Sequence, residues 1–469
     1  MQLTSAVFLF FILPLSLPLV LLLPKRYRRL ALSLLSILIY VLANSGNPWG
    51  ILQIGALVCL TVTLAYLPTP HSVGSAKFRS ALLVAVALSS FIGARVVDEY
   101  FNTPYSYPVG LLFVTLGIIS YVFDYARGDV IRPRNPLELV GYLLFFPTLT
   151  VGPIVRSKHY FDRTEDIGIR PALLTEGLRS YMLGYIKRVA IAAVLMRAIQ
   201  DLLDYNHAIF SPTILIALLL CAFLFFYFFI SGSADLARGV CGMCGIALPR
   251  DRSNALSAPT PDHMLYGTVL SLRSFLLDYV KHPLCGKKNS KKRRALSLLL
   301  IYCITVLVLR VRAELLLIGL PILLFSLLVE FTPVRGLLTA KRRWRWLLSP
   351  LSLLICSLFA LSLLLPAPLD LFPLIASAFT VRGNYPPTYI LGVVQDANYL
   401  LFLMILLAVF LPWGYLRRFA LRKVSDRTAL LLSIVEISLL FAGFILTLIY
   451  FLPQFPSYVE YAFHAGGAP

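Results

Sequence analysis

Long apolar segments, separated by short loops rich in lysine and arginine, recur along most of this chain. A helix needs about 20 consecutive apolar residues to cross the hydrocarbon core of a bilayer. Of the 469 residues, 59% are hydrophobic and only 14% are charged, whereas soluble domains carry about 25% charged residues. The sequence therefore predicts an all-α polytopic membrane protein.

The apolar runs predict about 11 to 13 membrane segments, with some re-entrant or interfacial helices among them. Candidate spans lie near residues 5–23, 30–45, 51–67, 80–97, 107–124, 136–155, 173–200, 208–230, 296–309, 315–332, 346–365, 396–416 and 428–452. No linker is long enough to separate a soluble domain, so we expect a single integral membrane domain over residues 1–469.

The basic loops indicate how the chain is threaded, because cytoplasmic loops collect Lys and Arg. The cluster at 25–29 predicts an N-terminus outside, and a first apolar run that is a retained helix rather than a cleaved signal. The basic clusters at 287–294 and 341–345 then lie inside, in a cytoplasmic (inner) membrane. This threading accounts for the net charge of +20, so the charge does not indicate nucleic-acid binding.

One apolar region is interrupted by the charged stretch RVRAE, which places Arg310, Arg312 and Glu314 within five residues. The stretch lies between two cytoplasmic clusters and must be an outward turn. The run before it, 296–309, gives about 21 Å of helix, less than the roughly 30 Å hydrocarbon core. Either the turn forms the floor of an outward-facing depression, or it lies at the surface and its arginines reach the headgroups.

Several motifs follow one another in the order found in a known family. They are Pro108 and Gly110; Ser120, Tyr121, Asp124, Arg127 and Gly128; Phe146, Pro147, Gly152, Pro153, Ile154 and Arg156; Ser231, Gly232, Asp235 and Gly239; and Asp278, Tyr279, Pro283, Leu284 and Gly286. The chain resembles the membrane-bound O-acyltransferase family. It is most similar to the bacterial branch that holds the membrane proteins of alginate O-acetylation and teichoic-acid D-alanylation. The core of the resemblance spans 106–330.

The resemblance implies two histidines that this sequence lacks. The first family histidine precedes the Asp-Tyr pair by nine residues, which is Val269 here. The second, regarded as the general base that activates the acceptor hydroxyl, falls at Leu309 or at the neighbouring Arg310. A general base needs a pKa near the working pH, and arginine is always protonated. His282 and Glu314 remain as the candidates for a substitute base.

Arginine forks match carboxylates and phosphates, so the outward turn can also be interpreted as an anion-binding funnel. Its expected residues are Arg310, Arg312, Glu314, Asp278, Tyr279, Asp235 and Ser231. In the simpler interpretation Glu314 only neutralises the arginines, and Asp235 pairs with Arg238 on one helix face. We expect no metal and no cofactor.

Two functions from different classes follow. The missing histidines favour a catalytically degenerate scaffold or binding subunit in the export, assembly or modification of a cell-envelope polysaccharide. The resemblance supports an active O-acyltransferase that moves an acyl group from a cytoplasmic thioester to an extracytoplasmic polymer. Expected partners are membrane lipids, envelope-polymer proteins and an acidic acyl carrier protein. The carrier's expected contacts are Lys287, Lys288, Lys291, Lys292, Arg293 and Arg294.

Overall fold

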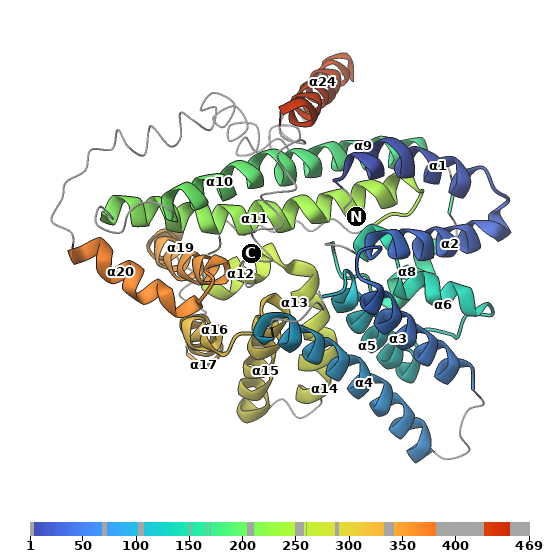
Figure 1. Ribbon diagram of the computed structural model, residues 1–469, viewed down its shortest axis with the longest axis horizontal. Coiled ribbons are helices and arrows are strands. Elements are labelled where there is room, and N and C mark those ends of the chain that lie inside the picture. Colours follow the sequence, from blue (N-terminus) through green and yellow to red (C-terminus); the bar gives the residue numbers. More distant parts are fainter. Residues whose placement is uncertain are drawn as a thin grey trace. The chain divides into compact units, whose positions relative to one another are not determined.

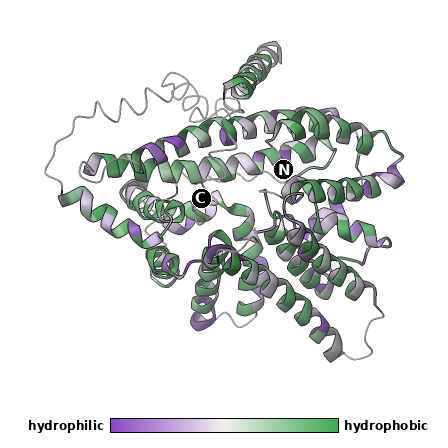
Figure 2. Cartoon of the chain, in the orientation of Figure 1, coloured by the Kyte–Doolittle hydropathy of each residue, from purple (hydrophilic) through white to green (hydrophobic). Residues whose placement is uncertain are grey.

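The computed structural model describes residues 4–67, 73–101, 107–149, 152–165, 167–168, 170–203, 211–248, 258, 260–286, 290–332, 342–380 and 426–450. Every regular element within these ranges is a helix (Figure 1). Hydrophobic residues run along most of the helices (Figure 2). Within the described residues, four helical stretches are long and apolar enough to cross a membrane: Pro48–Tyr66, Lys77–Tyr100, Pro212–Met243 and Ala313–Phe331. The predicted all-α polytopic fold is confirmed.

Short polar side chains begin several of these helices. The Asn47 side chain accepts a hydrogen bond from the Gly50 N–H at 2.9 Å and caps α3 (Pro48–Tyr66). Asn135 caps α6 (Pro136–Leu143), and Ser290 caps α15 (Lys291–Leu309). Such caps satisfy N–H groups that have no partner within the helix. Each of these three helices therefore begins where its sequence supplies an acceptor.

The chain folds into two units, and the described residues of the first lie within 1–178 and 236–352. Its helices before residue 178 are η1 (Phe8–Ile12), α1 (Leu13–Leu21), α2 (Lys25–Ala43), α3, α4 (Val73–Tyr100), α5 (Leu111–Arg127), α6, α7 (Phe146–Leu149), α8 (Ser157–Thr164) and the beginning of α9 (Pro171–Tyr185). After the end of α11 (Pro212–Met243) follow α12 (Pro261–Thr268), α13 (Leu270–Leu276), η5 (Leu277–Lys281), α14 (His282–Cys285), α15, α16 (Ala313–Ile318) and α17 (Leu320–Phe331).

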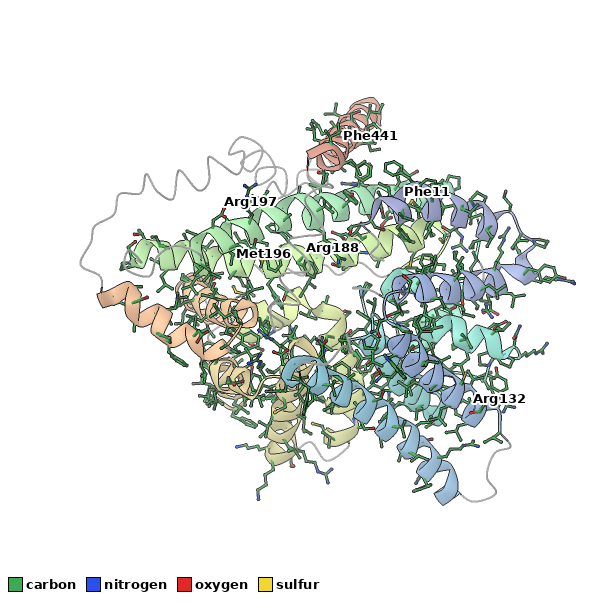
Figure 3. The ribbon with its side chains drawn as sticks, viewed as in Figure 1. Phe11, Arg132, Arg188, Met196, Arg197 and Phe441 are labelled. Carbon is green, nitrogen blue, oxygen red and sulfur yellow. The ribbon has the colours of Figure 1, made fainter. Side chains whose placement is uncertain are left out.

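The second unit is formed by residues 179–235 and 353–466. It holds the end of α9, the π-helix η2 (Ile186–Ile191), α10 (Ala192–Leu203), most of α11, most of α19 (Arg342–Leu364), η6 (Pro368–Asp370), α20 (Leu371–Thr380) and α24 (Asp426–Tyr450). Arg188 of η2, labelled in Figure 3, is buried and donates a hydrogen bond to Ser233 of α11 at 3.1 Å. The predicted span 396–416 lies outside the described residues.

Contacts within the first unit agree with the predicted threading. Asn44 and Val109 exchange hydrogen bonds at 3.1 and 2.9 Å, and both lie at predicted outer ends. Arg132 donates to the Ala65 carbonyl at 3.2 Å, and both lie at predicted inner ends. Loops that the basic clusters assign to one side therefore meet each other in the structure.

The described part of the expected span 136–155 is not one long helix. This stretch forms two short helices, α6 and α7, of eight and four residues, so α6 is only about 12 Å long. Arg29 contacts both the beginning of α6 and the end of α8. It pairs with Glu138 at 3.4 Å and donates a hydrogen bond to the Thr164 carbonyl at 2.8 Å. The beginning of α6 and the end of α8 therefore lie close together, which favours a re-entrant path for this segment.

Candidate functional site

A buried carboxylate joins three elements that carry the sequence motifs. Asp124 of α5 is 4% exposed. Its oxygens accept hydrogen bonds from the Ser157 hydroxyl at 2.5 Å and the Tyr279 hydroxyl at 2.8 Å. Ser120 completes the network, 2.9 Å from the Tyr279 hydroxyl oxygen. Because each partner is a hydrogen-bond donor, the charge is satisfied, and the network fixes η5 against α5 and α8.

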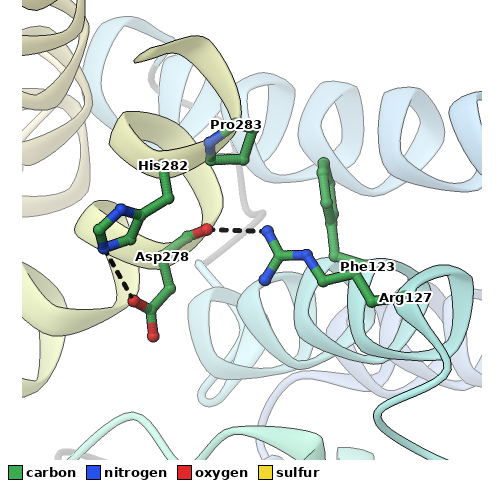
Figure 4. Close-up of a pocket in the computed structure, with 5 residues that line it drawn as sticks. All are labelled: Phe123, Arg127, Asp278, His282 and Pro283. Carbon is green, nitrogen blue, oxygen red and sulfur yellow. Dashed lines mark hydrogen bonds and ion pairs between the residues drawn. The ribbon is translucent and has the colours of Figure 1, made fainter. Parts of the chain in front are cut away.

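A pocket of about 590 Å³ opens beside this network, lined by Phe123, Arg127, Asp278, His282 and Pro283 (Figure 4). His282 Nε2 lies 3.6 Å from Asp278 Oδ1, and Arg127 donates to the Asp278 carbonyl at 2.9 Å (Figure 4). Asp278 also forms an ion pair with Arg156. The structure thus brings two predicted residues, Asp278 and His282, to one pocket. The His282 side chain is 71% exposed.

A second, narrower pocket of about 80 Å³ lies next to Arg156. Arg156, His159 and Arg163 line it from α8 and the residue before it, and Ser271 and Ser274 line it from α13. Burial lowers the pKa of His159, and the positive charges of Arg156 and Arg163 lower it further. Neither His159 nor Arg163 was among the predicted site residues, although their spacing from Arg156 is a visible helical signal.

The outward turn is held by an acid that was not among the predicted site residues. Glu99, near the end of α4, lies 2.9 Å from Arg310 and 2.5 Å from Arg312. The three side chains are 13% to 18% exposed. The arginines therefore pair with an acid of α4, and Glu99 provides the neutralisation that was expected from Glu314. Oε2 of Glu314 is buried and has no hydrogen-bond partner among the described residues.

Asp235 and Ser231 belong to the second unit, where both contact Lys187 of η2. Lys187 Nζ lies 2.7 Å from Asp235 and donates to the Ser231 hydroxyl at 3.1 Å. Helix spacing suggested Arg238 as the partner of Asp235 and gave no indication of Lys187. Lys187 and Asp235 are 48 positions apart in the chain, so no local helical spacing could predict that they interact.

The positions of the two missing family histidines have different surroundings, because Val269 lies against an apolar cluster whereas Arg310 pairs with Glu99. Val269 packs against a buried cluster that includes Phe275, Tyr279 and Ile301. Val308, the neighbour of Leu309, packs against the same cluster. Valine and leucine can neither accept nor donate a proton. The general-base role that the resemblance assigns to Leu309 or Arg310 is therefore not filled by either side chain.

The predicted carrier surface is described only in part. Lys291, Lys292 and Arg293 are exposed at the beginning of α15. Arg294 instead pairs with Glu330 at 3.1 Å and stacks over Phe331. Lys287 and Lys288 lie outside the described residues. Three exposed cations thus remain at this helix end.

These helices and sites describe an all-α polytopic membrane protein. Residues 126–328 match the model of the membrane-bound O-acyltransferase family, so the chain carries a domain of that family, as the motifs predicted.

The relatives belong to the bacterial branch that the motifs indicated. The chain is 29% identical to a probable alginate O-acetylase of Azotobacter vinelandii over 62% of its length and 61% of the relative. It is 30% identical to one of Pseudomonas fluorescens over 62% and 58%. It is 24% identical to a teichoic acid D-alanyltransferase of Lacticaseibacillus rhamnosus over 34% and 42%. The match thus spans about three fifths of the curated O-acetylases. The names of these relatives describe acyl transfer to polymers of the cell envelope.

Proposed function

We propose that this protein is a catalytically degenerate member of the family, which acts as a scaffold or binding subunit in the export, assembly or modification of a cell-envelope polysaccharide. One observation carries the proposal. Val269 and Val308, at and beside the positions of the family histidines, pack against the same hydrophobic cluster. Acyl transfer to a hydroxyl needs a base within about 3 Å of the proton that it removes. None of Val269, Leu309 and Arg310 can be that base, because valine and leucine carry no titratable group and arginine is always protonated.

We place the protein in the bacterial cytoplasmic membrane with its N-terminus outside. The proposed partners are proteins of envelope-polymer export, together with an acidic acyl carrier at Lys291, Lys292 and Arg293. Exposed cations attract an acidic protein over about one Debye length, roughly 8 Å at physiological salt. This carrier contact would let a degenerate subunit position a donor for another enzyme.

An active O-acyltransferase is the second candidate, and the pocket in Figure 4 supports it. His282 lies 3.6 Å from a carboxylate oxygen of Asp278, and a carboxylate partner can orient a histidine that acts as a base. The acyl group would come from a cytoplasmic thioester. Against this, His282 is largely exposed, and an efficient transfer site excludes water.

The test is a measurement of alkali-labile acyl ester in the cell envelope of the native host. The strains are wild type, a deletion, the complemented deletion, and deletions complemented with Arg310→Ala, Glu314→Ala or His282→Ala. His263→Ala serves as the matched control, because His263 contacts Thr260 and Asp262 at the start of α12, away from this pocket. For a scaffold we expect ester to be insensitive to all four substitutions while the protein accumulates.

Loss of ester in His282→Ala but not in His263→Ala, at equal protein level, would identify an enzyme and overturn the proposal. Polymer export is measured in the same strains. A scaffold predicts that deletion impairs export or assembly of the polymer, and that His282→Ala does not.

A further inference from the structure

We propose that the pocket formed by Arg156, His159 and Arg163 with Ser271 and Ser274, here termed the α8 pocket, binds a phosphate group. The ligand class is a phosphate monoester or diester. The inference concerns an activity that the proposed function does not require, since a phosphate site serves a scaffold and an enzyme equally.

The three basic residues line the pocket together because of their spacing. Residues 156, 159 and 163 are separated by three and four positions, so they share one face of a helix. Arg156 is the residue at the start of α8, and His159 and Arg163 lie within it. All three line the same pocket. Lys158, on another face, is 50% exposed and lies 3.6 Å from Asp129.

The charge of the α8 pocket favours an anion. No aspartate or glutamate among the described residues lines it, and the acids that influence His159 most, Asp162 and Asp124, do not line it either. Asp278 pairs with Arg156 from outside the lining, and Arg163 donates to the Ala247 carbonyl at 2.6 Å. A guanidinium has five N–H donors, so both arginines have donors beyond these contacts.

The size of the pocket selects a small group. Its volume of about 80 Å³ exceeds the roughly 15 Å³ that one water needs. It is well below the roughly 300–1,000 Å³ of sites that hold drug-sized ligands. Arginine forks bind phosphate oxygens in pairs, and the serine hydroxyls opposite are additional donors. A phosphate group matches both the space and the donors.

The histidine supplies a way to observe the ligand. Burial and the two arginines hold the pKa of His159 below its usual value. A dianionic or monoanionic phosphate beside the ring would offset the arginines and favour the imidazolium, so binding should raise this pKa. His282 lines the other pocket and serves as an internal reference in the same spectrum.

The experiment uses full-length protein with ¹³C-labelled histidines in nanodiscs of zwitterionic lipid. The His159 resonance is identified by its loss in His159→Gln. Its pH titration is recorded with inorganic phosphate, with sodium chloride at equal ionic strength, and in nanodiscs that contain phosphatidylglycerol. We expect the His159 pKa to shift upward with phosphate or with phosphatidylglycerol. The His282 resonance, as the internal reference, should titrate in the same way in all arms.

The source of the group follows from which arm responds. A shift with dissolved phosphate alone identifies a soluble monoester, and a shift with phosphatidylglycerol alone identifies a lipid headgroup. Arg163→Gln should weaken binding at least about tenfold, because it removes a charge-assisted contact, whereas Lys158→Gln should not change it. Arg163→Lys, which keeps the charge, checks that the loss is not a folding defect. No shift in any arm, or an equal shift with sodium chloride, would overturn the proposal.

Discussion

At the scale of single residues, the charged stretch RVRAE shows how tertiary contacts change the interpretation of a sequence. Two arginines in an apolar region indicated either a binding funnel or neutralisation by Glu314. The structure pairs Arg310 and Arg312 with Glu99, which lies 211 and 213 positions earlier in the chain. The end of α4 and the RVRAE turn are both predicted to lie outside, so the threading already placed these residues on the same side of the membrane. The individual partner could not be inferred, since several acids share that side.

Replacing this shared acid should destabilise the protein. Removing one member of a buried ion pair leaves an uncompensated charge and costs about 3–5 kcal/mol. Glu99→Gln removes the negative charge that Arg310 and Arg312 share. We expect the free energy of unfolding in detergent to fall by about 3 kcal/mol. The measurement is a denaturation series of Glu99→Gln, Arg312→Gln and the double variant. Coupling requires that the double variant loses less than the sum of the single ones, and strict additivity would contradict the pairing.

At the scale of helices, glycines allow one close contact within the first unit. A Cβ atom at Gly177 of α9 would lie 2.6 Å from the backbone nitrogen of Met243 and 2.8 Å from the carbonyl carbon of Gly242, at the end of α11. Backbone atoms cannot give way as a flexible side chain does. Small residues let membrane helices approach in this manner, and neither helix reveals the contact by its own sequence.

Gly177→Ala should therefore force these two helices apart, at a cost of about 1–3 kcal/mol. Gly93→Ala in α4 is the matched control, because no atom lies within 4 Å of its added Cβ. Alanine favours a helix over glycine by up to about 1 kcal/mol. We expect the thermal midpoint in detergent to fall for Gly177→Ala and to stay level or rise for Gly93→Ala. Equal effects of the two substitutions would argue against the close contact.

At the scale of the whole molecule, a re-entrant path of α6 and α7 would complete the predicted threading. With 136–155 as a span, three crossings would separate the basic cluster at 127–134 from that at 287–294 and place them on opposite sides. With α6 and α7 re-entrant, two crossings remain, α9 through α10 and then α11. Both basic clusters then lie on the same side, as the distribution of positive charge requires.

Cysteine labelling tests this threading. Arg134→Cys and Lys158→Cys flank the re-entrant segment at exposed positions, so we expect both to react with an impermeant maleimide only from the cytoplasmic face. Trp49→Cys, at the beginning of α3 and 66% exposed, should react only from the outer face. The background is a variant in which exposed Cys59 is replaced. Labelling of Arg134→Cys and Lys158→Cys from opposite faces would contradict the re-entrant path and show that the segment 136–155 crosses the membrane.

The sequence by itself determined the membrane class, the all-α fold and the family, because apolar length, basic loops and ordered motifs are local signals that each segment carries alone. It also located Asp278 and His282, which are four positions apart and share a helix face. Only the tertiary structure decided the partners of the buried charges, the division of 136–149 into short helices and the joining of α8 to α13 around a pocket. These features depend on contacts between residues distant in the chain. Such contacts stabilise the fold but produce no periodic pattern in the local sequence.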